Sequence, residues 1–238
     1  SGKGSHAVDS QGKTYVDMGS GIGVTAFGYG DEAWKAAVIE QLDKVQHISN
    51  LYYTEPCAKL AKLLCEKTGM KKVFFANSGA EANECAIKAA RKYSAEKKGA
   101  DCYTIVTLQN SFHGRTLTTL AATGQDHFHQ LYQPLTPGFV HVPANDIQAL
   151  KDCVAKVKVA GILMEVVQGE GGVLPLTAEY LAAANKLAHE QDIPLMMDEV
   201  QIGNGRSGKL YGYMNFDVQP DIVSTAKGLG GGLPIGAC

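Results

Sequence analysis

This sequence of 238 residues has no excess of either charge and no cysteine spacing typical of a disulfide framework or a zinc site. Its 22 lysine and arginine residues nearly balance its 24 acidic residues, which gives a net charge of −2. Nucleic acids and anionic membranes favour proteins with a clear cationic excess, so we expect neither as a partner. The six cysteines include no C-x-x-C pair, which favours reduced thiols and a cytoplasmic protein.

Long apolar runs are also missing. No run approaches the ~18 residues that a membrane-spanning helix needs, and the first residues lack the apolar core of a secretory signal. The sequence ends at Cys238, directly after a glycine-rich run and without a terminal helix, which predicts a chain truncated at its carboxyl end.

Hydrophobic residues make up 45% of the chain, enough for one large core or two modest ones. Gly12 and Lys13 separate two short segments and predict a hairpin near the start. A glycine-rich loop over 19–30 then precedes two stretches with helical spacing of apolar residues, one beginning at Asp31 and one over 56–68.

From residue 73 onwards, short apolar runs alternate with amphipathic helical stretches. The expected strands are 73–76, 103–108, 139–142, 161–167, 195–198 and 221–225, and the expected helices are 80–98, 146–157 and 178–191. Strands that are apolar throughout, with helices between them, predict an α/β fold with a mostly parallel sheet covered on both faces. Ligands of such sheets bind beyond the carboxyl ends of the strands, so functional residues should follow each run.

The polar turn over 77–83 follows the first of these runs and opens a helix. Free N–H groups and the positive end of the helix dipole suit a phosphate there, Gly79 permits close approach, and the Ser78 hydroxyl can donate. An ordinary turn with Ser78 as helix cap explains this segment equally well.

After the second run, Phe112 could stack on a flat heteroaromatic ring, and Arg115 offers two parallel donors to a carboxylate. The intervening His113 is interpreted as a structural histidine. Glu165 and Glu170 follow the run over 161–164 without a neighbouring histidine, so we expect no metal. Glu170 suits a role in neutralising a cation or shaping its loop.

Two further charged residues lie at or just beyond the end of an apolar run, where removing a charge from water costs free energy. Asp198 closes 195–198, and a carboxylate there needs a cationic partner such as the protonated ring nitrogen of pyridoxal phosphate. Lys227 leaves the run over 221–225 and enters a glycine-rich stretch, where desolvation lowers the pKa of an amine and favours covalent attachment to a carbonyl.

Together these segments resemble the class III aminotransferases of the fold-type I pyridoxal-phosphate family. The matching segments, in the family's order, are 77–83, 112–115, 168–172, 198–201 and 226–227. The resemblance implies a three-layer sandwich in which 56–238 form the cofactor-binding large domain, incomplete at its end. Residues 1–55 would be an amino-terminal segment of the small domain, comprising hairpin, loop and helix.

By this resemblance, Lys227 binds the cofactor covalently and moves the proton, while Asp198 pairs with the ring nitrogen. Phe112 and Val200 cover the two ring faces, and Gln201 lies near the phenolic oxygen. The remaining expected contacts are to phosphate from Ser78, Gly79 and Ala80, and to substrate from Arg115, Glu165 and Glu170. Ala80 departs from the threonine of many relatives, which removes a hydroxyl but no backbone donor.

Within the class, residues 49–54 resemble acetylornithine aminotransferases. This implies transfer of the terminal amino group of N-acetylornithine to 2-oxoglutarate, in arginine biosynthesis, by a homodimer. Ornithine and 4-aminobutyrate remain alternative amino donors. Two interpretations outside the class are a non-catalytic module that binds a phosphate ligand and a nucleotide-binding domain, which would leave Asp198 and Lys227 unexplained.

Overall fold

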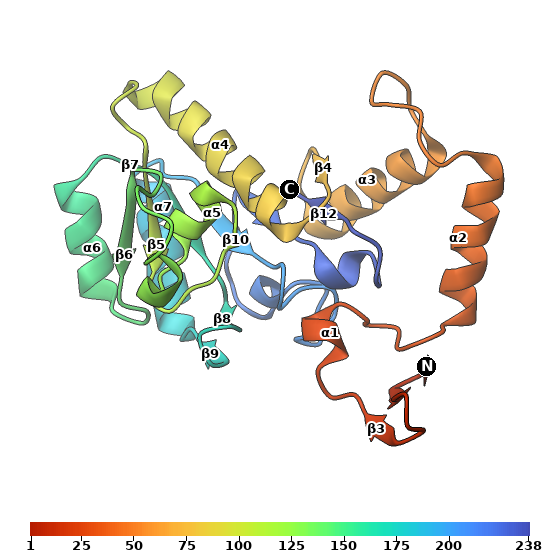
Figure 1. Ribbon diagram of the computed structural model, residues 1–238. Coiled ribbons are helices and arrows are strands. Elements are labelled where there is room, and N and C mark those ends of the chain that lie inside the picture. Colours follow the sequence, from red (N-terminus) through yellow and green to blue (C-terminus); the bar gives the residue numbers. More distant parts are fainter.

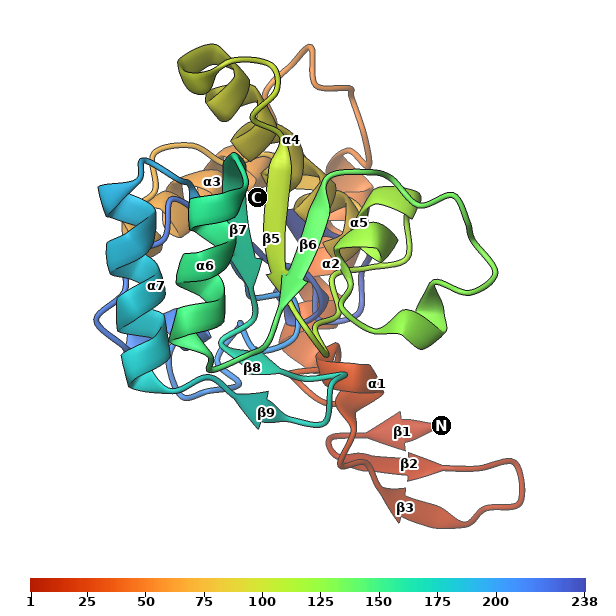
Figure 2. The ribbon, with the colours of Figure 1, turned by 90° about the vertical axis from the view of Figure 1, so that its left-hand side faces the viewer.

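A computed structural model describes residues 1–238, and its centre is a sheet of five parallel strands in the order β11-β10-β7-β5-β6. The strands are β5 (Thr104–Leu108), β6 (Phe139–Val142), β7 (Val159–Met164), β10 (Leu195–Asp198) and β11 (Ile222–Ser224). Figure 2 shows β7, β5 and β6 side by side and pointing the same way. The predicted parallel sheet is confirmed, with strand ends within a few residues of those expected.

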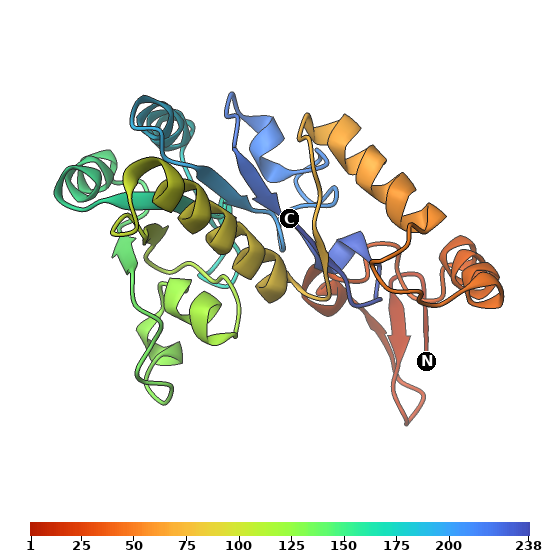
Figure 3. The same ribbon diagram turned by 90° about the horizontal axis from the view of Figure 1, so that it is seen from above.

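Helices cover both faces of this sheet and complete the expected three layers (Figure 3). The long helix α4 (Gly79–Lys98) and the short α5 (Leu117–Ala122) lie on one face, and α6 (Ile147–Lys156) and α7 (Ala178–Glu190) on the other. Successive strand residues point to opposite faces. Ile162 therefore packs in a core cluster with Tyr180 of α7, while Leu163 packs in a second cluster with Ile87 of α4. This double burial explains why the strands are apolar throughout.

The run expected as a strand over 73–76 differs from the prediction. Only Phe75–Ala76 (β4) is a strand, and it pairs antiparallel with β12 (Gly236–Ala237), outside the five-stranded sheet. An antiparallel bridge between Thr225 and Ala237 connects this pair to the end of β11. The chain doubles back after Lys227, and its final run supplies the partner strand that β4 needs.

The amino-terminal region lies beside the sandwich and has little buried surface of its own (Figure 1). Strands β1 (Gly2–Lys3), β2 (His6–Val8) and β3 (Thr14–Val16) form an antiparallel sheet, which confirms the hairpin. The single turn α1 (Ser20–Gly23) follows, then α2 (Glu32–Lys44) and α3 (Glu55–Thr68). Helix α2 buries no residue and α3 buries only Leu64. The predicted domain boundary at residue 55 stays a prediction.

The remaining elements are short and lie mainly in loops at the carboxyl edge of the sheet. They are β8 (Val167–Gln168), β9 (Leu174–Pro175) and three 3-10 turns, η1 (Asp126–Phe128), η2 (Gly212–Asn215) and η3 (Lys227–Leu229). No helix has both the length and the apolar character that crossing a membrane requires.

Candidate active site

All eleven residues that the sequence singled out line one cavity of about 430 Å³. They are Ser78, Gly79, Ala80, Phe112, Arg115, Glu165, Glu170, Asp198, Val200, Gln201 and Lys227. The cavity lies where β5, β7, β10 and β11 end, because parallel strands present their carboxyl ends at one edge. Residues 232–235 line another side of the cavity, and the sequence did not indicate the part played by 233–235.

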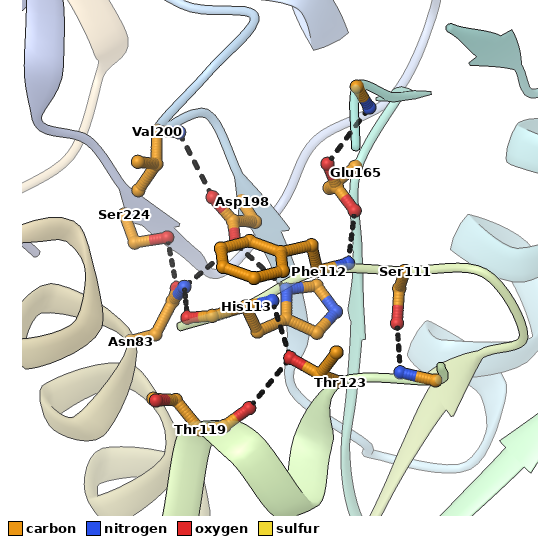
Figure 4. Close-up of polar contacts among 12 residues, drawn as sticks. Asn83, Ser111, Phe112, His113, Thr119, Thr123, Glu165, Asp198, Val200 and Ser224 are labelled. Atoms are coloured by element: carbon orange, nitrogen blue, oxygen red, sulfur yellow. Dashed lines mark hydrogen bonds and ion pairs between the residues drawn. The ribbon is translucent and has the colours of Figure 1, made fainter. Parts of the chain in front are cut away.

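Asp198, at the end of β10, is 3% exposed and has three hydrogen-bond donors (Figure 4). Its Oδ2 accepts from Nδ2 of Asn83 at 2.7 Å and from Nδ1 of His113 at 2.8 Å, while Oδ1 accepts from the Val200 N–H at 3.0 Å. A carboxylate offers about four acceptor positions, so one remains for a further donor. Because Asp198 only accepts, the proton of a neutral His113 lies on Nδ1.

Asn83 contacts this aspartate directly and Ser224 supports Asn83 from behind, and the sequence indicated a role for neither. The Ser224 hydroxyl donates to Oδ1 of Asn83 at 2.5 Å, and Asn83 also donates to the backbone oxygen of His113. In the parallel pairing of β10 with β11, Ser224 stands opposite Asp198, so this neighbour follows once the strand register is known. His113, interpreted as structural, is in fact a direct partner of Asp198.

Lys227 follows β11 and has a left-handed backbone, with φ of 47°. Side chains other than glycine, asparagine and aspartate rarely adopt this conformation, so neighbouring contacts must impose it. Asn204 supplies one of them, since its Nδ2 donates to the Ala226 oxygen at 3.0 Å, one residue before the lysine. Burial lowers the pKa of the Lys227 amine, while Asp198 and Glu170 oppose the shift. The amine therefore loses its proton more readily than an exposed lysine does.

The turn before α4 is organised as an anion seat. Oγ of Ser78 accepts from the Glu81 N–H, and the Glu81 carboxylate accepts from the Asn77 N–H at 2.6 Å, close to the pattern of a capping box. The N–H groups of Gly79 and Ala80 have no acceptor in the chain. A Cβ on Gly79 would come within 2.5 Å of Cγ1 of Val200, so only glycine fits there without displacing a neighbour.

Glu165 joins two loops of the cavity. Its Oε1 accepts from the Phe112 N–H at 2.9 Å, and its Oε2 accepts from the Gly169 N–H at 3.2 Å. Burial raises the pKa of this carboxyl to about 7, with the charge of Asp198 as a smaller contribution. Gln201 packs so closely on Gly169 that a Cβ there would overlap its Oε1. The loop that carries Glu170 is therefore held at Gly169 by both the Glu165 carboxylate and the Gln201 side chain.

The cavity thus combines an amine whose pKa burial lowers, a buried carboxylate with acceptor capacity left, unpaired N–H donors and an aromatic ring. Arg115 adds a cation that makes no ion pair or hydrogen bond within the chain. No group of three or more histidine, cysteine or acidic side chains is arranged to hold a metal ion. Such a set suits a flat, anionic, carbonyl-bearing ligand.

Comparison with known proteins agrees with this chemistry. The sequence matches the class III aminotransferase family over residues 1–238, and the chain belongs to that family. It is 56% identical to an acetylornithine aminotransferase of Haemophilus ducreyi over 99% of the chain and 60% of that protein. It is also 45% identical to a succinylornithine transaminase/acetylornithine aminotransferase of Pseudomonas aeruginosa, over 99% of the chain and 58% of that protein.

Solved structures of aminotransferases superpose on nearly the whole chain. The ornithine aminotransferase of Toxoplasma gondii gives a TM-score of 0.95 at 30% identity, covering 100% of this chain and 57% of the other. The N-acetylornithine aminotransferase of Stenotrophomonas maltophilia gives 0.87 at 38% identity, covering 99% and 59%. The fold is that of fold-type I transferases. The chain spans about 60% of the length of the curated relatives that it matches.

Proposed function

We propose that this chain is the cofactor-binding part of a pyridoxal-phosphate-dependent aminotransferase that acts on N-acetylornithine and 2-oxoglutarate. The observation that carries the proposal is that Lys227 and Asp198 line the same cavity, although Asp198 ends β10 and Lys227 follows β11. A module that only bound a phosphate ligand would have no need of a half-buried amine in the cavity that Gly79 and Ala80 also line.

The residues of the cavity fit the cofactor. When bound, pyridoxal phosphate supplies an aldehyde carbon and a ring that accepts electrons from the substrate. Asp198 has one acceptor position left for a protonated ring nitrogen, and its three donors fix its orientation. The Nζ of Lys227, whose pKa burial lowers, suits covalent attachment and would later move the proton at the substrate carbon. Phe112 and Val200 would lie against the two ring faces.

The phosphate would accept from the unpaired N–H groups of Gly79 and Ala80 and from the Ser78 hydroxyl. Ala80 offers its backbone donor although it lacks the hydroxyl of a threonine. Gln201, which lines the cavity beside Gly169, is proposed to lie near the phenolic oxygen.

The substrate would be held by charge. Arg115 has all its donors free for the α-carboxylate of the amino donor or of the 2-oxo acid. Glu170 is proposed to neutralise a second cation when the amino donor binds and to release it for the 2-oxo acid. Glu165 supports both groups through its bonds to the Phe112 and Gly169 N–H groups.

The choice of amino donor rests on the relatives. Three curated relatives at 48–56% identity are named acetylornithine aminotransferases. The products would be N-acetylglutamate semialdehyde and glutamate, in arginine biosynthesis. Ornithine is the second candidate, because the ornithine aminotransferase of T. gondii superposes with the higher TM-score.

We also propose a homodimer. Leu51 is 85% exposed and Tyr53 is 100% exposed, next to a helix, α2, that buries no residue. Large apolar side chains gathered in this way favour cover by another surface. Light scattering of the full-length protein tests this, with a monomer as the contrary result. The six free cysteines are consistent with a cytoplasmic location.

The decisive experiment uses the full-length protein and the variant Lys227→Ala. Incubated with pyridoxal phosphate, the wild type should gain visible absorbance that borohydride bleaches, leaving a modified peptide that contains Lys227. The variant should bind without this change. Turnover of N-acetylornithine, ornithine and 4-aminobutyrate is then compared by kcat/KM. Faster turnover of ornithine would replace the proposed donor, and an unchanged spectrum of the wild type would favour a non-catalytic module.

A further inference from the structure

The guanidinium of Arg115 lies against two aromatic rings, Phe112 and Phe128, that also contact each other. It lies 5.7 Å from the ring centroid of Phe112 and 5.1 Å from that of Phe128, within the range of cation–π contacts. Phe128 belongs to η1 and does not line the cavity. This ring is therefore outside the set of residues that would touch cofactor or substrate.

A comparison with Arg91 shows that Arg115 is unusual in making no hydrogen bond within the chain. Arg91 also lies over a ring, 5.1 Å from the centroid of Phe139, but its Nε and Nη2 donate to the backbone oxygens of Tyr103 and Pro137. Those hydrogen bonds tie Arg91 to the structure. Arg115 is held by aromatic faces alone.

This difference has a chemical consequence. A carboxylate or carbonyl partner would fix Arg115 equally well, but it would occupy donors and reduce the positive charge offered to a ligand. Ring faces attract the cation without accepting its N–H groups. The planar donor fork thus stays complete for a bidentate contact with a carboxylate.

Phe128 is in turn oriented by its neighbours. Its ring meets Phe112 edge to face, with centroids 5.7 Å apart and planes at 68°, and the His127 ring lies 4.0 Å away on η1. The backbone of Phe112 is fixed by Glu165. Glu165 thus fixes Phe112, Phe112 contacts Phe128, and both rings contact the Arg115 guanidinium.

We propose that Phe128 is a positioning residue that holds Arg115 ready for the carboxylate shared by the amino donor and the 2-oxo acid. The proposal rests on the proposed function and deepens it. Since both substrates present the same group, loss of Phe128 should weaken both to a similar degree. The expected rise in KM is roughly two- to fivefold, the range of an exposed cation–π contact, with kcat nearly unchanged.

The test compares three variants of the full-length protein. Phe128→Leu should raise the KM of both substrates, and Phe128→Tyr, which keeps a ring face, should restore values near the wild type. Phe139→Leu is the matched control, since it removes the ring under Arg91, and should leave both KM values unchanged. Binding of 2-oxoglutarate, measured by calorimetry, should weaken in Phe128→Leu by the same factor as its KM rises.

A double-mutant cycle with Arg115→Ala separates this role from a general effect on the fold. If Phe128 acts through Arg115, Phe128→Leu adds no further loss of 2-oxoglutarate binding in the Arg115→Ala background. An equal additional loss there, or wild-type affinity in Phe128→Leu alone, overturns the proposal. A wild type that binds 2-oxoglutarate but transfers no amino group would instead contradict the proposed function. The double-mutant cycle, which measures only 2-oxoglutarate binding, would still decide the role of Phe128.

Discussion

Replacing Asn83 by alanine would remove the contact that ties Asp198 to helix α4. The asparagine is 1% exposed, and its Nδ2 donates both to Oδ2 of Asp198 at 2.7 Å and to the His113 oxygen at 2.8 Å. Its Oδ1 accepts from the buried Ser224 hydroxyl. The substitution thus leaves Asp198 with two donors and leaves Ser224 without its acceptor.

The size of the effect follows from the kinds of bond involved. A hydrogen bond to a charged group contributes about 1.5–3 kcal/mol, and an unsatisfied buried hydroxyl costs about 1–3 kcal/mol. We therefore expect the free energy of unfolding to fall by about 3 kcal/mol in Asn83→Ala. The weaker orientation of Asp198 should reduce affinity for pyridoxal phosphate roughly tenfold to hundredfold, because each factor of ten corresponds to about 1.4 kcal/mol.

Urea unfolding of the cofactor-free protein and titration with pyridoxal phosphate, followed by absorbance, measure the two quantities separately. Asn215→Ala is a matched control, because its Nδ2 also makes two hydrogen bonds, to Ser207 and Gly212, outside the cavity. It should change stability by about 1 kcal/mol or less and leave cofactor affinity intact. Wild-type affinity in Asn83→Ala, with stability reduced, would refute the view that Asn83 orients Asp198.

Two further predictions concern the buried carboxyl and the tight turn of the cavity. The pKa of Glu165 is raised from 4.5 to about 7 by burial, so its folded form binds the proton more tightly than its unfolded form. Its contribution to stability is complete below pH 4.5 and is lost as pH rises towards 7, by about 3 kcal/mol. Glu165→Gln keeps only one of the two accepted N–H bonds but does not ionise, so in urea unfolding of the cofactor-free proteins its stability relative to the wild type should rise from pH 5 to 8. Parallel pH profiles of the two proteins would contradict this. Gly79→Ala should weaken cofactor binding through its overlap with Val200, and Val200→Ala should partly restore it in the double variant; a simple sum of the two single losses would count against the overlap.

Much of the site could be predicted from local pattern. Phe112, Asp198 and Lys227 each follow an apolar run, and parallel strands that are buried on both faces present their carboxyl ends at one edge. The positions of these residues along the chain therefore indicated a common cavity before any distance was known. The same reasoning gave the helix after Ser78 and its unpaired N–H groups, which depend only on residues close together in sequence.

Contacts between distant segments could not be predicted in this way. Asn83 and Ser224 are far apart in the chain and meet only because α4 crosses the sheet beside β11, with Ser224 in register with Asp198. The antiparallel partner of β4 was missed because a run of two residues carries no information about what it pairs with.

The sequence by itself determined the class of fold, the strand ends and the kinds of side chain that gather there, because hydrophobic periodicity and turn residues act over a few positions. Only the tertiary structure decided which donors surround Asp198 and which ring lies against Arg115. Those choices depend on strand order, register and the path of the connecting loops, since side chains at remote positions meet only after the layers have packed.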